Sequence, residues 1–327
     1  MIAPTVRVIL LIILIQCLSC SQNAVNRDTF FVEGSKIFAP NGEEFVARGV
    51  NKMIFYQDRS GAESYREIAK TGANIVRIFW FTKGTPEELD ATLSNCIANN
   101  MVAMPSVWEA TGKWGQLQQC VDYWSRKDIV EVIEKHKRYV LLNIANEAGN
   151  HEVSPAEYRE AYQNAVLRLR NSGLTVPLVI DAAAWGRRES DILNNGEEIL
   201  KADPLQNLIF SWHQWDSNIP QSRIKEAIDR AKAKGIAFII GEFAPMEVGC
   251  KCCIDYKYIL DYCQETGTGW MAWSWGPGNS DCEEMDMTED NKLETLHGWG
   301  FEVALSLKNS IQNTSERPCI FPGMNCD

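Results

Sequence analysis

Eight short apolar runs recur along the chain, and most are followed by a stretch with helical character. Successive runs end roughly 28 to 39 residues apart, which is the repeat of a strand–helix unit. The runs are nearly continuous in apolar residues rather than alternating, as expected for parallel strands covered on both faces. They span residues 44–50, 73–80, 101–108, 139–147, 177–183, 207–215, 237–243 and 269–275.

Helical patterns with ordinary start and stop signals lie between these runs. Thr85 and Ser154 each precede a proline, which is typical of a helix start, and several helices are expected to end on a glycine. A small hairpin is expected at residues 30–38. The expected helices cover residues 62–70, 86–99, 155–171, 221–234 and 254–266.

Eight such units predict an α/β fold, a single (β/α)8 TIM barrel with a short N-terminal β-hairpin. A doubly wound open sheet would need a glycine-rich phosphate loop after an early strand, and the sequence has none. A chain of 327 residues could form one large barrel or two ordinary domains. Because no linker or low-complexity segment interrupts the repeat, we expect one domain over residues 21–327.

Residues 1–20 have the pattern of an export signal. Arg7 supplies a positive charge, and residues 8–15 form an apolar segment too short to span a bilayer. We therefore predict a secreted, extracellular protein with no membrane contact after removal of the signal. Acylation of Cys20, as in a lipoprotein, is the alternative.

Eleven cysteines agree with an oxidising compartment. The crowded set near residue 250 has no histidine beside it and no paired C-x-x-C spacing, so we expect disulfides and no metal site. A C-terminal tail tied by a disulfide is part of this prediction. The plausible pairs are Cys319 with Cys326, Cys96 with Cys120, and Cys282 with one of Cys250, Cys252 and Cys253.

The net charge of −11 argues against a nucleic-acid surface, because phosphate binding needs clustered Lys and Arg. Acidity fits a neutral substrate and an extracellular protein. The eleven tryptophans are unusual, and several stand at predicted strand ends. Their flat apolar rings suit the apolar faces of sugars, although core packing is the ordinary role of a tryptophan.

Two of the apolar runs end on a glutamate, Glu147 in the fourth and Glu242 in the seventh. A carboxylate is rarely placed beside a core without a partner or a task. In an eight-stranded ring these strands stand on opposite sides, so the two side chains should face each other across the barrel mouth. Two opposed carboxyls are what hydrolysis of a glycosidic bond requires. A buried ion pair with a barrel arginine is the structural alternative.

Other polar and aromatic residues share the predicted strand ends, where a barrel carries its working groups. Arg77 is expected to pair with Glu242 and keep it ionised. Asn146 and His213 are candidate sugar contacts, although a core amide and a hydrogen-bonded wall residue are the plainer interpretations. The aromatic candidates for the substrate site are Trp108, Trp185, Trp215 and Trp275.

The chain resembles glycoside hydrolase family 5, and within it the bacterial endo-β-1,4-mannanases. The resemblance extends from about residue 31 to residue 302. Asn-Glu after the fourth strand and Glu after the seventh form a specific pair in this context. The segments that carry the resemblance are residues 74–78 (NIVRI), 143–148 (NIANEA), 179–186 (VIDAAAWG), 239–243 (IIGEF) and 266–276 (TGTGWMAWSWG).

The resemblance implies a retaining hydrolase that acts on mannan or glucomannan as a monomer, without metal or organic cofactor. Glu147 would be the acid/base and Glu242 the nucleophile, with their carboxyl groups about 5–5.5 Å apart. Arg77 would orient Glu242, and Asn146 would bind the sugar 2-hydroxyl. His213 would line the catalytic subsite, and Trp275 would form its floor.

Two positions depart from the family pattern. The family usually has a histidine at the end of the third strand, where this chain has Trp108. It usually has a tyrosine two residues after the histidine of the sixth strand, where this chain has Trp215. An endo-β-1,4-glucanase on the same scaffold therefore stays an alternative. A catalytically weak carbohydrate-binding protein is the alternative from another class.

Overall fold

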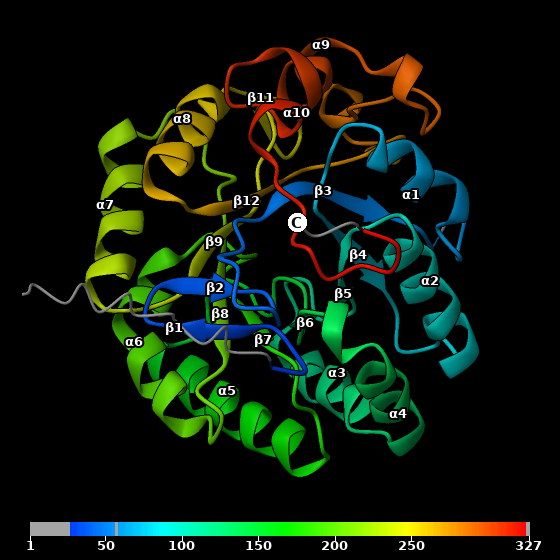
Figure 1. Cartoon of the computed structure of the whole chain (residues 1–327). Coiled ribbons are helices and arrows are strands. Elements are labelled where there is room, and N and C mark those ends of the chain that lie inside the picture. The colour runs from blue at the N-terminus through cyan, green and yellow to red at the C-terminus, as the bar shows by residue number, and fades with distance from the viewer. Residues whose placement is uncertain (1–26, 56–57, 325–327) are drawn as a thin grey trace, which may run out of the picture.

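The structure is a computed structural model that describes residues 27–55 and 58–324. Eight parallel strands close into a barrel, and helices surround it (Figure 1). The predicted (β/α)8 fold is confirmed. In order around the ring the strands are β3 (Arg48–Met53), β4 (Ile75–Trp80), β5 (Val102–Val107), β6 (Leu142–Asn143), β7 (Leu178–Asp181), β8 (Leu208–His213), β9 (Phe238–Glu242) and β12 (Gly269–Ala272).

The predicted N-terminal hairpin is present. It pairs β1 (Phe31–Glu33) with β2 (Lys36–Phe38) in antiparallel register. Asn207, just before β8, donates a hydrogen bond to the carbonyl of Phe30. The hairpin therefore lies at the amino end of the barrel strands, and in Figure 1 it crosses the end that faces the viewer. The opposite end is left open for a site.

The five predicted helices are present within two residues of their expected ends. Thr85 and Ser154 form capping boxes with Glu88 and Glu157. The helices are α1 (Ala62–Ala69), α2 (Pro86–Ala98), α3 (Leu117–Trp124), α4 (Lys127–Lys135), α5 (Pro155–Asn171), α6 (Glu189–Ala202), α7 (Gln221–Ala233), α8 (Tyr256–Thr266), α9 (Gly298–Phe301) and α10 (Ile311–Thr314).

Helices α3, α4 and α6 were not predicted, and each lacks a side-chain hydrogen bond at its N-cap. Helix α6 also contains Gly196, which ordinarily disfavours a helix interior. A Cβ at this glycine would lie 3.0 Å from Ile236, so the small residue permits close packing of the helix. Tertiary contacts, rather than local signals, stabilise these three helices.

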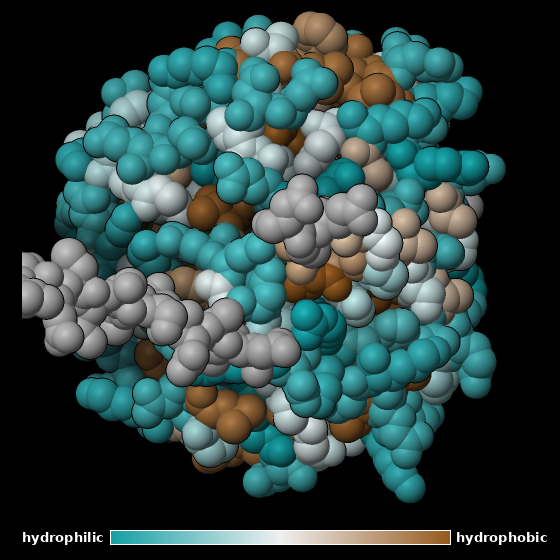
Figure 2. Space-filling view, in the orientation of Figure 1, coloured by the Kyte–Doolittle hydropathy of each residue, from teal (hydrophilic) through white to brown (hydrophobic). Residues whose placement is uncertain are grey.

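The core fills the barrel and the layer between strands and helices. Every residue of β4, β5 and β8 is buried, as their continuous apolar pattern predicts. The outer surface is different: in Figure 2 hydrophilic residues cover most of the face shown, and apolar residues form small patches. Across residues 27–55 and 58–324, no helix combines the length and apolar character needed to cross a membrane.

The predicted disulfide of Cys282 is present, and the predicted one between Cys96 and Cys120 is absent. Cys250 and Cys282 are bonded, with an S–S distance of 2.02 Å. Cys96 and Cys120 are instead free and buried, because they lie within the helix layer on α2 and α3, where Cys96 Sγ donates to backbone carbonyls. Cys319 is disulfide-bonded, and its predicted partner Cys326 lies outside the described residues.

The free thiols should be unreactive in the folded protein. Burial raises the pKa of the Cys120 and Cys263 thiols to about 12 and that of Cys96 well above its usual value. Since the thiolate is the reactive form, a maleimide should label these three residues only after unfolding. Peptide mass spectrometry after native and denatured labelling checks this. Labelling of Cys96 in the native protein would contradict the packing described here.

Candidate active site

The two predicted glutamates meet at the open end of the barrel. Glu242 ends β9, whereas Glu147 lies in the loop after β6 with a left-handed φ of 47°. One carboxylate oxygen of Glu147 lies within 4.8 Å of one of Glu242. Both glutamates line a cavity of about 750 Å³. Aromatic residues form much of the remaining wall, namely Phe79, Trp108, Trp185, Trp215 and Trp273.

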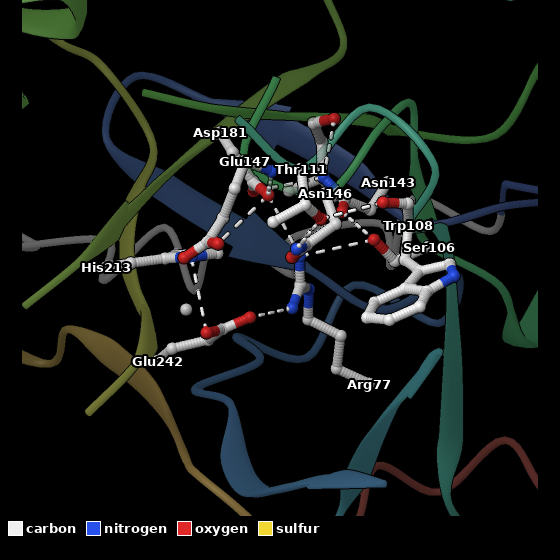
Figure 3. A network of polar contacts seen from close by, with 12 residues as sticks. Arg77, Ser106, Trp108, Thr111, Asn143, Asn146, Glu147, Asp181, His213 and Glu242 are labelled. Carbon is white, nitrogen blue, oxygen red and sulfur yellow. Dashed lines mark hydrogen bonds and ion pairs between the residues drawn. The ribbon is translucent and has the colours of Figure 1, made fainter. Parts of the chain in front are cut away.

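Arg77, on β4, holds the polar centre of the site together. Its guanidinium donates to Glu242 at 2.5 Å, so the predicted ion pair is present. The second terminal nitrogen donates to Asn146 at 2.7 Å and to Asp181 at 2.9 Å. Figure 3 shows Arg77 between Glu242 on one side and Asn146 on the other. One buried cation therefore orients these three groups, which come from three barrel strands or the loops that follow them.

Replacing Arg77 with methionine should destabilise the protein by about 3–5 kcal/mol, because two buried carboxylates would lose their partner. Chemical denaturation measures this loss. The matched control is Arg126→Met, which removes an ion pair with Asp128 from a side chain that is 45% exposed. That control should stay within about 0.5 kcal/mol of the unchanged protein. Equal effects of the two substitutions would contradict the role given to Arg77.

Asp181, at the end of β7, supports the site from below. It accepts the backbone N–H of Glu147 at 3.0 Å and a bond from Asn143 at 3.1 Å. Burial alone would raise the pKa of Asp181, but the charges of His213 and Arg77 lower it to about 2. The carboxylate is thus ionised at all ordinary pH values. It anchors the loop that carries Glu147.

His213 ends β8 and lies between the two glutamates. Its Nδ1 is 2.8 Å from an oxygen of Glu147 and 3.5 Å from one of Glu242 (Figure 3). Burial would lower the pKa of this ring, but the carboxylates of Glu242 and Asp181 raise it to about 10. His213 is therefore an imidazolium near neutral pH. It contributes positive charge beside both carboxyls.

Glu242 lies among charged groups that shift its pKa in opposite directions. Burial raises the pKa of Glu242 to about 7, His213 opposes this, and the nearby Glu147 carboxyl adds to it. The bond from Arg77 favours the negative charge on Glu242. Glu242 must be ionised to act as a nucleophile, and the positive charges of His213 and Arg77 favour that state.

The comparison with known families decides between the classes of protein considered above. The model of the family described as cellulase, glycosyl hydrolase family 5, matches residues 38–279. The chain belongs to glycosyl hydrolase family 5. The resemblance found in the sequence is confirmed, and the protein is a glycoside hydrolase.

Several proteins similar to this chain are mannanases. The chain is 32% identical to a mannan endo-1,4-beta-mannosidase of Salipaludibacillus agaradhaerens, over 90% of this chain and 97% of that protein. It is 30% identical to one of Cellvibrio japonicus, over 90% of this chain and 70% of that protein. The structure of a beta-mannanase from Streptomyces thermolilacinus with mannohexaose superimposes with a TM-score of 0.83 at 27% identity. That match covers 91% of this chain and 99% of the other.

The prediction that Trp275 forms the floor of the catalytic subsite in this family 5 site is wrong. Trp275 is fully buried outside the cavity, and its indole donates to the carbonyl of Asn291 at 3.0 Å. Trp273 lines the cavity instead, with its indole bonded to Asn279 at 2.7 Å. The physical reason is that β12 ends at Ala272, so the side-chain alternation of a strand no longer orients the residues that follow.

The other predicted site residues lie at the family 5 cavity or support it. Asn146, Trp108, Trp185 and Trp215 line the cavity, while Arg77 and His213 contact its two glutamates. The polar residues beneath them were not among the predicted site residues. They are Ser106 and Asn143.

Two groups of side chains in the described residues have the donor atoms that a metal ion could use. Donor atoms of Glu147, His213 and Glu242 lie within 4.8 Å of one another. The positive charge of His213 disfavours a cation there. Cys250 and Cys282 form the second group with Glu284, but their sulfurs are bonded to each other. The prediction that the enzyme uses no metal or organic cofactor stays a prediction.

Proposed function

We propose that this protein is an endo-β-1,4-mannanase that cleaves internal linkages of mannan or glucomannan with retention of configuration. The observation that carries the proposal is the approach of Glu147 and Glu242 oxygens to within 4.8 Å. Retaining glycosidases hold their carboxyl groups about 5–5.5 Å apart, whereas inverting enzymes need about 6.5–9.5 Å to admit a water. The narrow gap favours double displacement.

In the first step Glu147 protonates the glycosidic oxygen while Glu242 attacks the anomeric carbon. The bond to the leaving chain breaks, and an ester bond between the sugar and Glu242 forms. In the second step Glu147 takes a proton from water, and the water oxygen displaces Glu242. Arg77 orients Glu242 and, with His213, stabilises its negative charge between turnovers.

Substrate contacts are assigned to the remaining cavity residues. We assign Asn146 to the sugar 2-hydroxyl, because it lies beside Glu147 and is itself fixed by Arg77. The exposed faces of the cavity aromatics are suited to stacking on sugar rings. Trp273 takes the platform role first expected of Trp275. Trp108, Trp185 and Trp215 complete the aromatic wall.

Reducing-sugar release should be measured side by side on pure mannan, galactomannan, glucomannan and carboxymethylcellulose. We expect release from the mannans and glucomannan and none from carboxymethylcellulose. Mannose and glucose differ in the orientation of the 2-hydroxyl, so the four substrates test whether the enzyme distinguishes the two orientations. Release from carboxymethylcellulose and glucomannan, with none from pure mannan or galactomannan, would identify a glucanase. No release from any of the four, with retained binding, would identify a carbohydrate-binding protein.

We further propose that residues 1–20 direct secretion and that residues 21–327 act as a monomeric extracellular enzyme. Residues 1–20 lie outside the described part of the chain. The bond between Cys250 and Cys282 supports an oxidising compartment. The intact mass of protein recovered from the medium, with gel filtration, tests this. A lipid-modified mass beginning at Cys20 would favour the anchored alternative.

A further inference from the structure

The indole N–H of Trp215 contacts both glutamates at once. Its nitrogen lies 3.2 Å from an oxygen of Glu147 and 3.2 Å from an oxygen of Glu242. The side chain is only 3% exposed, so water does not replace this donor. A single hydrogen is therefore shared between two carboxyls that also repel each other.

The ring of Trp215 is held in this place from several sides. It packs edge-on against Trp273, with ring centroids 6.0 Å apart. The backbone N–H of the preceding Gln214 donates to the carbonyl of Glu242 at 2.9 Å, which ties the loop to β9. The backbone N–H of Trp215 donates to the carbonyl of His213. The donor is thus preorganised relative to both carboxyls.

We propose that Trp215 is a positioning residue whose N–H follows the negative charge as it moves between Glu242 and Glu147 during the reaction. This inference rests on the proposed retaining function. The indole nitrogen has one hydrogen to donate and cannot accept a hydrogen bond, so the residue cannot carry a proton between the carboxyls. It can only strengthen its bond to whichever oxygen is charged.

The charges of the two steps balance in this way. When the glycosidic oxygen takes the proton of Glu147 and Glu242 forms the ester, the negative charge passes to Glu147. The Trp215 N–H then donates mainly to Glu147, which must be a carboxylate to accept a proton from water. When water releases the sugar, Glu242 regains its charge and Glu147 its proton. The N–H returns to Glu242, and no other reactant is needed.

Trp215→Phe tests the inference, because it keeps an aromatic ring and removes the N–H. We expect kcat on mannan to fall about 10- to 100-fold. This loss is smaller than for removal of a donor that is the sole hydrogen-bond partner of the developing charge. KM should change by less than about threefold. Removing a donor from a carboxylate raises its pKa, so both limbs of the kcat/KM pH profile should move to higher pH by about half a unit or more. Trp215→Tyr, which restores a donor, should return the limbs toward their original positions.

A matched control separates this role from simple packing. Trp124→Phe removes another buried indole N–H, which donates to the carbonyl of Ile144 at 2.9 Å outside the cavity lining. This variant should lower Tm and leave both pH limbs in place. If Trp215→Phe does not fold, β-(3-benzothienyl)alanine at position 215 keeps the ring shape and replaces the N–H with sulfur.

Unmoved pH limbs in a folded variant without the N–H would overturn the inference, whatever the loss of activity. A loss confined to KM would do the same, because it would indicate substrate packing alone. The proposed function fails separately, if the unchanged enzyme releases no sugar from mannan or gives an inverted product. A retaining enzyme whose Trp215→Phe limbs stay in place disproves only the role of Trp215.

Discussion

Glu242→Gln is expected to abolish hydrolysis, lowering kcat on mannan by about 10⁴-fold or more, as removal of a nucleophile does in other covalent enzymes. The amide cannot form the ester with the sugar, whereas its size and shape are nearly unchanged. Arg77 can still donate to the amide oxygen, so the fold should persist. Binding of mannan, measured by affinity electrophoresis, should remain.

The control for Glu242→Gln is Glu134→Gln, which alters another hydrogen-bonded glutamate. Glu134 lies on α4 and accepts two bonds from Thr175, each of 2.7 Å. Activity should be unchanged in this variant. Hydrolysis by Glu242→Gln at a tenth of the original rate, in a preparation free of wild-type enzyme, would remove Glu242 from the role of nucleophile.

Glu147→Ala should lower kcat on mannan by about 10²- to 10⁴-fold, since the acid and the later base are both lost. A dinitrophenyl glycoside leaves without protonation, so the first step should stay fast and the covalent sugar–enzyme should accumulate. Azide is a nucleophile that needs no base, and it should restore turnover. Mass spectrometry follows the covalent species, and NMR identifies the azide product.

The configuration of that product separates the two glutamates. Attack of azide on the ester of Glu242 gives a glycosyl azide with the configuration of the substrate. In a variant that lacks the nucleophile, azide would attack the substrate directly and give the opposite configuration. The opposite configuration from Glu147→Ala would therefore reverse the roles assigned to Glu147 and Glu242.

The strands were predictable because each is a contiguous apolar run that the barrel buries on both faces. The ends of the strands were harder to predict. The fourth run continues to Glu147, yet only Leu142–Asn143 pairs in the sheet, and Glu147 follows in a loop with a left-handed backbone. Helix α6 could not be predicted from the sequence, because Gly196 and the missing N-cap bond both disfavour a helix locally. Packing against neighbouring residues stabilises it instead.

The paired glutamates and their arginine were predictable, because charge at the end of an apolar run needs a partner. The residues that support them from beneath were not predicted, although the sequence contained a signal for them. Ser106 and Asn143 are polar residues inside apolar runs, and both bond to Arg77. The exchange of Trp275 for Trp273 could not be foreseen, since sequence alone does not tell where β12 ends. Likewise, the spacing of Cys96 and Cys120 does not reveal how their helices pack.

The central claim is that Glu147 and Glu242 cleave a β-mannosidic bond by double displacement. Proton NMR of mannohexaose during hydrolysis tests it most directly, because the first product appears before its anomers equilibrate. The proposed mechanism predicts that the new reducing end forms first as the β-anomer and only later converts to the mixture. A new reducing end that forms first as the α-anomer would contradict it.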